Sequence, residues 1–415
     1  MFFDNTEQLP PDPVLGVGVA YNNDPTPTVQ SKPDDLIKVN VGVGTYKDEN
    51  GAAYVMPVVA KAERAVVDEK IPSGKEYLPI DGLAPFRVAA GKLMFGTATY
   101  ESLAPHMAST QALSGTGAVR LIAALLDKLL PKPATVYVSN PSWPNHKNIF
   151  LQAGFASARD YRYVTPAGAF DEAGMLADVR GAPRGSVFIV QACPHNPTGV
   201  DPTPAQWEAI ARAVHESGHF VVVDSAYQGL ASGDPAADAG PIPALAASGV
   251  EFAVCQSFSK TLSLYCERVG VLHVICTSPK ASAAVLSQLK ALARAMYSNP
   301  PAHGARIAAR VLGTPELLAE WREDIKHMVA RMNRMRTMLY AELQRLGTPG
   351  EWSCVTNQRG LFSLLPVTPQ HVEQLRDKWH VYMMSSGRIN IAGLTERTVP
   401  YFARALDDVV RHPKL

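Results

Sequence analysis

The sequence is poor in cysteine and carries no excess of charge of either sign. Its 415 residues include five cysteines, scattered without a CxxC spacing or a metal-ligand pattern of Cys and His. This distribution favours reduced thiols over a disulfide framework, and we expect no metal site. With 39 Lys and Arg against 38 Asp and Glu, the chain lacks the basic excess typical of proteins that bind nucleic acid or anionic membranes. Small ligands are therefore favoured over polyanions.

Long apolar runs and targeting patterns are also lacking. No uninterrupted apolar run approaches the length of a membrane span. The first residues, MFFDNTEQLPPDP, have neither the basic and apolar regions of a signal peptide nor the arginines of a transit peptide. We therefore expect a cytoplasmic protein. The ending Pro413-Lys414-Leu415 is loosely similar to the Ser-Lys-Leu peroxisomal signal, so a microbody location stays an alternative.

The length of the chain and its composition predict two domains. A chain of 415 residues exceeds what one simple core supports. The proline-rich start, through Pro33, predicts extended structure, and residues 1–18 are assigned to an N-terminal arm. We assign residues 54–327 to a large domain, and residues 19–53 together with 328–415 to a smaller α+β domain.

Short apolar runs alternate with helical patterns through the middle of the chain. The expected strands are Thr135–Val138, Val187–Val190, Phe220–Val223, Phe252–Cys255 and Val271–Ile275, and the expected helices include Val119–Leu130 and Pro204–His215. Strands that are apolar throughout, with helices between them, predict an α/β fold with a mostly parallel sheet covered on both faces. A long helical pattern from Thr314 to Leu346 then leads into the smaller domain.

Polar side chains follow two of these strands. Asp224 comes directly after Phe220–Val223, and Lys260 follows Phe252–Cys255 after a run rich in hydroxyl groups. Ligands collect at the carboxyl ends of parallel strands, so both side chains can belong to one site. A lone lysine is usually a surface residue. A lysine that bonds covalently to a ligand must lose its proton, and burial near other cations lowers its pKa.

Two loop segments offer ligand contacts of a different kind. The segment 114–118, SGTGA, precedes an expected helix, and its glycines and free N–H groups suit a phosphate, although the same residues are common helix caps. It lacks the third glycine of GxGxxG and the lysine of a P-loop, which argues against a nucleotide. The segment 194–199, PHNPTG, is typical of a turn, with Asn196 available to a ligand and His195 expected to be structural.

A set of short motifs follows in order along the chain, within a longer match that extends from about Pro13 to Gly393. They are SGTGA (114–118), NPSWPNHK (140–147), HNPTG (195–199), DSAYQG (224–229), SFSK (257–260), ERVG (267–270), YSNPPAHGA (297–305) and SGRIN (386–390). Together they resemble the aspartate aminotransferase family of class I pyridoxal-phosphate-dependent aminotransferases. The resemblance implies the fold-type I architecture. It also implies ping-pong transfer of the amino group from L-aspartate to 2-oxoglutarate, giving oxaloacetate and L-glutamate.

The resemblance also implies how pyridoxal 5'-phosphate is held. Lys260 would carry it as a Schiff base and act with Asp224 and Tyr227 in catalysis. Asp224 would pair with the pyridinium nitrogen, Tyr227 and Asn196 would hydrogen-bond the ring oxygen, and Trp143 would stack on the ring. The residues implied to hold the phosphate are Ser114, Gly115, Thr116, Ser257, Arg268 and, from a second subunit, Tyr77.

The substrate site implied by the resemblance contains two arginines. Arg388 would bind the α-carboxylate in a bidentate manner, which favours Arg over Lys. Arg294, from the neighbouring subunit, would bind the distal carboxylate of aspartate or glutamate. The other residues implied to contact the substrate are Gly44, Trp143 and Asn196. Because two of the implied residues act from the partner, a homodimer with shared active sites is expected.

Several positions depart from the family pattern and leave the substrate open. Thr45, Gln191, Thr261 and Cys266 stand where the family often has other residues. The segments EYLPIDG (76–82) and NQRGLFS (357–363) are similar to aromatic aminotransferases, whereas Lys47, Thr116 and Asn299 are similar to aspartate enzymes. An aromatic or broad-specificity aminotransferase is therefore the main alternative. A lyase or decarboxylase on the same scaffold, and a binding protein in which Lys260 and Asp224 form an ion pair, are the others.

Overall fold

The computed structural model describes residues 2–10, 12–32, 34–69 and 74–413. Its contacts divide the chain into two compact units. One comprises the segments up to Ala53 and from Arg331 onward, and the other is Tyr54–Ala330. The assignment of these parts as arm, cofactor-binding domain and small domain stays a prediction. Of the C-terminal Pro413-Lys414-Leu415, the last two residues lie outside the described part.

The Tyr54–Ala330 unit is built on a seven-stranded sheet with the order β2-β8-β7-β6-β5-β3-β4. Its strands are β2 (Met107–Leu113), β3 (Thr135–Asn140), β4 (Ser157–Arg162), β5 (Val187–Gln191), β6 (Phe220–Ser225), β7 (Phe252–Ser257) and β8 (Val269–Ile275). Strands β4, β3, β5, β6 and β7 pair in parallel, and β8 is antiparallel to both β7 and β2. The expected mostly parallel α/β sheet is confirmed.

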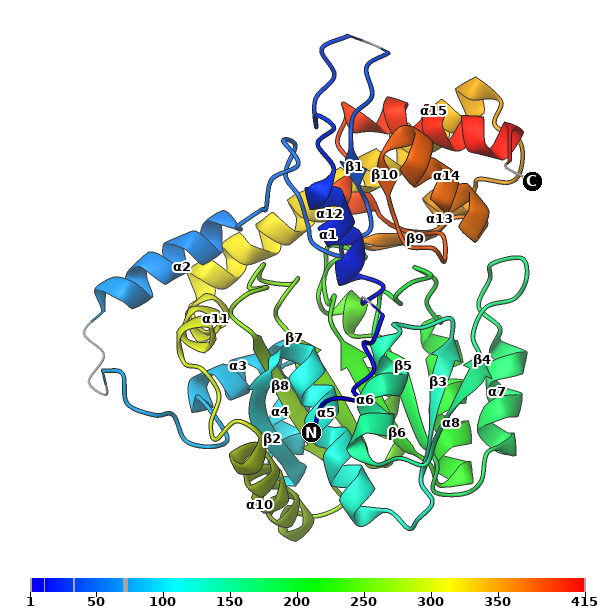
Figure 1. Cartoon of the computed structure of the whole chain (residues 1–415). Helices are drawn as coiled ribbons and strands as arrows, with labels where there is room; N and C mark the ends of the chain where they lie inside the picture. Colours follow the sequence, from blue (N-terminus) through cyan, green and yellow to red (C-terminus); the bar gives the residue numbers. More distant parts are fainter. Residues whose placement is uncertain (1, 11, 33, 70–73, 414–415) are drawn as a thin grey trace. The chain divides into compact units, whose positions relative to one another are not determined.

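Helices cover both faces of this sheet (Figure 1). The helices of this unit are α2 (Pro57–Asp68), α3 (Ala84–Phe95), α4 (Thr97–Leu103), η1 (Ala104–His106), α5 (Ser114–Leu129), α6 (Asn145–Ala153), α7 (Glu172–Gly181), α8 (Pro204–Ser217), η2 (Ala237–Ala239), α9 (Ile242–Ser248), α10 (Pro279–Met296) and α11 (His303–Gly313). Side chains of α5, α6 and α10 pack on one face, and those of α3, α7, α8 and α9 pack on the other.

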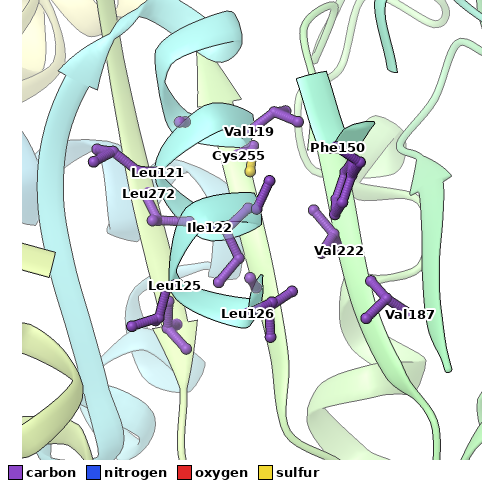
Figure 2. Close-up of a cluster of buried hydrophobic side chains, with 14 of the residues drawn as sticks. Val119, Leu121, Ile122, Leu125, Leu126, Phe150, Val187, Val222, Cys255 and Leu272 are labelled. Atoms are coloured by element: carbon purple, nitrogen blue, oxygen red, sulfur yellow. The ribbon is translucent and has the colours of Figure 1, made fainter. Parts of the chain in front are cut away.

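Strand alternation explains why the sheet strands are apolar throughout. Val222 faces the core under α5, whereas Val221 and Val223 face the core under α8. Successive residues of a strand point to opposite faces, so a sheet covered on both sides needs apolar residues at every position. Figure 2 shows the α5 core, in which Ile122 and Leu126 point from the helix toward the strands.

The other unit contains short strands and helices. Its elements are α1 (Leu15–Asn23), β1 (Val39–Asn40), α13 (Cys354–Asn357), β9 (Phe362–Leu364), α14 (Pro369–Trp379), β10 (Val381–Tyr382), β11 (Arg388–Asn390), η3 (Ile391–Gly393) and α15 (Thr398–Arg411). β1 pairs with β10 in parallel, and β9 pairs with β11 in an antiparallel manner. The second segment of this unit begins at Arg331, which lies within the long helix α12 (Pro315–Leu346).

The prediction of extended structure through Pro33 is wrong over α1. Asp12 Oδ1 accepts hydrogen bonds from the backbone N–H groups of Val14 and Leu15, at 2.9 and 2.8 Å, and Gly16 N donates to the Asp12 carbonyl. This is the role of a helix-capping residue, with Pro13 next to it at a position that needs no amide donor. The Asp-Pro pair was the missed signal. After α1, the described residues of this segment form only the short strand Val39–Asn40.

In the described part of the chain, no helix combines the length and apolarity needed to cross a membrane. Within the same residues, no group of three or more His, Cys, Asp or Glu side chains is arranged to hold a metal ion.

The packing of α5 gives a test of the core. Ile122 is fully buried against the sheet, whereas Leu129 on the same helix is 56% exposed. We expect Ile122→Ala to lower the free energy of unfolding by about 2–5 kcal/mol, because it leaves a cavity. The control Leu129→Ala is expected to change it by no more than about 0.5 kcal/mol. Urea unfolding measures both, and equal effects would contradict the packing described.

Candidate active site

The site in the Tyr54–Ala330 unit begins with a buried carboxylate at the end of β6. Asp224 is 8% exposed, and its Oδ2 lies 2.9 Å from Nε2 of His146, a fully buried residue of α6. A carboxylate only accepts hydrogen bonds, so the His146 Nε2–H is the donor. The Ser142 hydroxyl lies 3.0 Å from His146 Nδ1 and fixes the other side of the ring. Asp224 is therefore held in one orientation.

Gln191 connects this carboxylate to the next loop. It ends β5 and pairs in register with Asp224. Its Nε2 donates to Ser142 Oγ at 3.3 Å and to the Asn196 carbonyl at 2.8 Å, and its Oε1 accepts from Asn196 N at 2.9 Å. The side chain that departs from the family pattern therefore binds the HNPTG loop and the Ser142 hydroxyl.

Lys260 joins the same network through an aromatic ring. Its Nζ lies 5.2 Å from the centroid of the Tyr227 ring, within the range of a cation–π contact. Asn196 Nδ2 donates to the Tyr227 hydroxyl at 3.3 Å. The strand ends of β5, β6 and β7 thus bring together an amine, a phenol, an amide and a carboxylate. The strand that ends with Asp224 and Ser225, β6, pairs with β7, the strand that precedes Lys260.

Three serine hydroxyls and one arginine form a second cluster. Ser114 Oγ lies 2.9 Å from Ser257 Oγ and 2.8 Å from Ser259 Oγ. Arg268 Nη1 donates to Ser259 Oγ at 3.3 Å and to the Tyr265 carbonyl at 2.8 Å. Hydroxyl donors with a guanidinium form a set of groups that suits a phosphate or a carboxylate.

The first turn of α5 adds backbone donors to this cluster. The helix begins at Ser114, so SGTGA is part of the helix and does not precede it. Leu113 stands at the N-cap and has no side-chain acceptor, so no side chain caps the first amides. A Cβ on Gly115 would come to 3.0 Å from Ser257 Cβ and 3.7 Å from Asp224 Oδ1. The missing side chain keeps this position open beside the serine cluster, as anion binding at a helix N-terminus requires.

The backbone around the cluster is strained. Ser114 and Arg268 have φ angles of 62° and 54°, and Ser114 N donates to the Arg268 carbonyl at 3.1 Å. Left-handed conformations of residues other than glycine cost about 1–3 kcal/mol each and gather at functional sites. The two strained residues are the helix start and the arginine of the cluster.

His195 belongs to the packing beneath the site. Its Nε2 and Nδ1 lie 2.9 Å from Ser139 Oγ and Thr198 Oγ1, and its ring stacks on Tyr163 at 3.9 Å. Burial lowers the pKa of His195 well below its usual range, so the ring is neutral. These contacts agree with the prediction of a structural histidine.

Other predicted site residues of this unit lie around the network. The Trp143 ring meets the His146 ring edge-to-face at 5.1 Å between centroids and packs on the α5 core. Thr116 lies in the first turn of α5. Tyr77 is 80% exposed and lines a cavity of about 580 Å³ with Asn299. Arg294 is an exposed residue of α10 that donates to Ser298 Oγ. Tyr77 and Arg294 are outside the network in the described residues.

Gly44 and Arg388 come together in the other unit. Arg388 is a buried residue of β11, and its Nη2 donates to the Gly42 carbonyl at 2.7 Å. Its guanidinium carbon lies 4.3 Å from the centroid of the Phe362 ring. A Cβ on Gly44 would come to 2.8 Å from Phe362 Cζ, so the glycine leaves room for that ring.

Sequence reasoning did not single out three residues of these clusters. Ser142 and Ser259 lie inside the quoted motifs, and Phe362 lies inside NQRGLFS, but nothing in the sequence distinguishes them from their neighbours. Their contacts join residues that are far apart in the chain, up to 145 positions for Ser114 and Ser259. The motif membership was the only available signal.

Comparison with known proteins places this chain in a family. Residues 37–406 match the family model described as aminotransferase class I and II. The chain belongs to this family.

Individual relatives cover nearly the whole chain. It is 43% identical over 408 residues to the chloroplastic aspartate aminotransferase of Arabidopsis thaliana, covering 98% of this chain and 87% of that protein. The structure is similar to that of the cytoplasmic aspartate aminotransferase of Saccharomyces cerevisiae, with a TM-score of 0.93, 39% identity, and coverage of 99% and 98%. It is also similar to an aromatic-amino-acid aminotransferase of Burkholderia pseudomallei covalently bound to pyridoxal phosphate, with a TM-score of 0.91, 38% identity, and coverage of 99% and 100%.

The approach of β8 to α5 gives a test of the anion cluster. A Cβ on Gly270 would lie 2.5 Å from the Ser114 carbonyl carbon and 2.7 Å from the Gln256 oxygen, and neither backbone atom can swing aside. We expect Gly270→Ala to lower the free energy of unfolding by about 1–3 kcal/mol. The control Gly181→Ala, with no atom within 4 Å, should raise it by about 0.4–1 kcal/mol. Equal stabilities in thermal unfolding would refute the close approach.

Proposed function

We propose that this chain is a pyridoxal-phosphate-dependent aspartate aminotransferase that transfers the amino group of L-aspartate to 2-oxoglutarate, giving oxaloacetate and L-glutamate. The observation that carries the proposal is the pair of clusters at the strand ends. They contain the Lys260 amine, the Asp224 carboxylate and the Ser114–Ser257–Arg268 anion site. A lysine, a carboxylate and a phosphate site are the three attachments that pyridoxal phosphate needs. Membership of the aminotransferase family and the aspartate aminotransferases among its relatives support the same reaction.

The hydrogen-bond donors of the serine and arginine cluster fit the phosphate group of the cofactor. Ser114, Ser257 and Arg268 would hold the phosphate with the amides of Gly115 and Thr116, because the α5 N-terminus carries positive potential. When bound, the cofactor supplies an electron sink for the electrons released at the substrate Cα.

Asp224 and the loop around it would control the ring. Its carboxylate, held by the His146 Nε2–H, would keep a proton on the ring nitrogen. The Asn196 amide and the Tyr227 hydroxyl would donate to the ring oxygen, and Trp143 would stack on the ring face.

Lys260 is assigned both covalent attachment and proton transfer. Its Nζ would bond to the cofactor in the resting enzyme. With substrate bound, the Nζ amine would be the base that accepts the substrate Cα proton and the acid that donates a proton back. The Tyr227 ring beside Nζ would help to hold this amine in place.

Two arginines would define the substrate. Arg388, oriented by Gly42 and Phe362, would bind the α-carboxylate, and Gly44 would leave room beside it. Arg294 would bind the distal carboxylate of a substrate in a second copy of the chain, and Trp143 and Asn196 would contact the substrate near the ring.

A homodimer is part of this proposal, because two of its assigned residues are exposed. Tyr77 and Arg294 are exposed in the single chain, and Tyr77 borders a cavity with Asn299 of the YSNPPAHGA motif. Their assigned roles place this surface against the phosphate and the substrate of a partner copy. Residues 54–327 would then be the cofactor-binding domain, residues 19–53 with 328–415 the small domain, and residues 1–18 the arm.

We also propose a cytoplasmic location. Among relatives with similar sequence identity to this chain, one is named as chloroplastic and one as cytoplasmic. Cell fractionation with an untagged C-terminus distinguishes the cytoplasm from a microbody.

An aromatic or broad-specificity aminotransferase is the second candidate, favoured by the similarity to the aromatic enzyme of Burkholderia pseudomallei. The values of kcat/KM for aspartate, tyrosine and phenylalanine, each with 2-oxoglutarate, separate the two. The aspartate proposal predicts the highest value for aspartate. A higher value for tyrosine or phenylalanine would leave the scaffold in place and overturn the substrate.

Lys260→Ala tests the assigned chemistry. We expect transamination to be lost while the cofactor is still bound non-covalently, because the phosphate and ring contacts remain. Borohydride treatment followed by peptide mapping should yield a cofactor adduct on Lys260 in the wild type and none in the variant. An adduct on another lysine of the wild type would sink the assignment.

Arg294→Ala tests the dicarboxylate preference. We expect kcat/KM for aspartate to fall by about 10- to 100-fold, because a charged hydrogen-bond partner is lost, with little change for phenylalanine. Lys280→Ala, which removes an exposed cation from the same helix, should leave both values unchanged. Equal losses on aspartate and phenylalanine would show that Arg294 does not contact the distal carboxylate.

A further inference from the structure

Arg336 is a cation buried without a carboxylate. It lies on α12 and is 2% exposed. No acidic side chain in the described part of the chain pairs with it, and burial lowers its pKa to about 9. Burying an unpaired charge is unfavourable, and an apolar side chain of similar size often replaces such a group without loss of stability. The guanidinium therefore calls for an explanation beyond the filling of space.

All acceptors of this guanidinium come from one short segment, 355–363. Nη1 donates to the Val355 carbonyl at 2.8 Å and to Ser363 Oγ. Nη2 donates to the carbonyls of Gly360 and Phe362, at 2.8 and 2.7 Å. The planar fork of an arginine can hold four acceptors in one plane, which neither lysine nor an apolar residue can do. Arg336 thus fixes the chain that leads into β9.

The segment held by Arg336 carries the ring beside Arg388. Phe362, whose carbonyl Arg336 binds, places its ring 4.3 Å from the Arg388 guanidinium carbon. β9 also pairs with β11 in the register Phe362↔Asn390 and Leu364↔Arg388. A shift of Phe362 would therefore move both the ring and the strand that orient Arg388.

We propose that Arg336 is a positioning residue for the carboxylate-binding Arg388, acting through the Phe362 ring. The inference rests on the proposed function, in which Arg388 binds the α-carboxylate. Because every amino-acid substrate has that carboxylate, Arg336 influences all substrates equally. This separates its effect from that of Arg294, which discriminates between them.

Arg336→Met should raise KM for aspartate and for phenylalanine by the same factor, about tenfold, with little change in kcat. This is the result expected when the lost interaction is equally strong in the bound substrate and in the transition state. Arg336→Lys should restore part of the loss, because it keeps the charge and reaches fewer acceptors. Arg334→Met is the control. Arg334 is exposed on the same helix and pairs with Glu49 and Glu396, so KM should not change.

A double-mutant cycle with Phe362→Leu tests the route. If Arg336 acts through the ring, Phe362→Leu should raise KM alone, and adding Arg336→Met should raise it little further. If the increase in KM of the double variant equals the product of the increases of the two single variants, the proposal is overturned. A lowered unfolding temperature with unchanged KM would show a purely structural role and would also overturn it. Should Arg336→Met fail to fold, Arg336→Lys takes its place in the cycle. Wild-type turnover of either amino acid checks the proposed function separately.

Discussion

The parallel register of β5, β6 and β7 is the constraint on which the candidate site depends. It pairs Gln191 with Asp224 and Asp224 with Cys255, so the three strands end at one edge of the sheet. The loops that follow carry Asn196, Tyr227 and Lys260 into one network. A slip of one residue in β6 would turn Asp224 toward the opposite face and away from His146. The helices packed on both faces prevent that slip, because it would also move every buried valine of β6 to the wrong side.

Buried polar groups in both units are held by contacts with neighbouring side chains and carbonyl groups. Asp224 is fixed by His146, which is itself held by Ser142, and Ser114 is held by Ser257 and Ser259. Arg388 and Arg336 are fixed mainly by carbonyl groups and an aromatic ring. Groups that are held by hydrogen bonds in a low-dielectric interior are rigid. Such rigidity is what a site requires when it must hold a cofactor and a substrate in one geometry.

The sequence predicted the centre of the sheet better than its edges. β5, β6 and β7 are apolar runs because both of their faces are covered. β2 contains Ser109, Thr110 and Gln111, and β4 reads SARDYR, so neither shows an apolar run. β4 lies at the edge of the sheet, where polar residues are tolerated, and Ser109 of β2 contacts His273 of the neighbouring strand. Helix α1 was missed because the prolines before it masked the capping role of Asp12.

The candidate site was predictable where a residue stands at a strand end. Asp224 and Lys260 follow apolar strands, and Arg268 and Arg388 were assigned from their motifs. Ser142, Ser259 and Arg336 were not predictable, because their importance lies in contacts with residues distant in the chain. Arg336 in particular has the helical setting of a surface cation, and only the structure shows that it is buried and binds one segment.

The absorption spectrum of the purified, cofactor-loaded protein tests the central claim most directly. We expect a yellow protein that loses its colour when aspartate is added and regains it with 2-oxoglutarate, because Lys260 first releases and then rebinds the cofactor. This single titration reports cofactor attachment and both half-reactions. A protein that shows no such colour after incubation with pyridoxal phosphate would contradict the assignment of Lys260 and with it the proposed function.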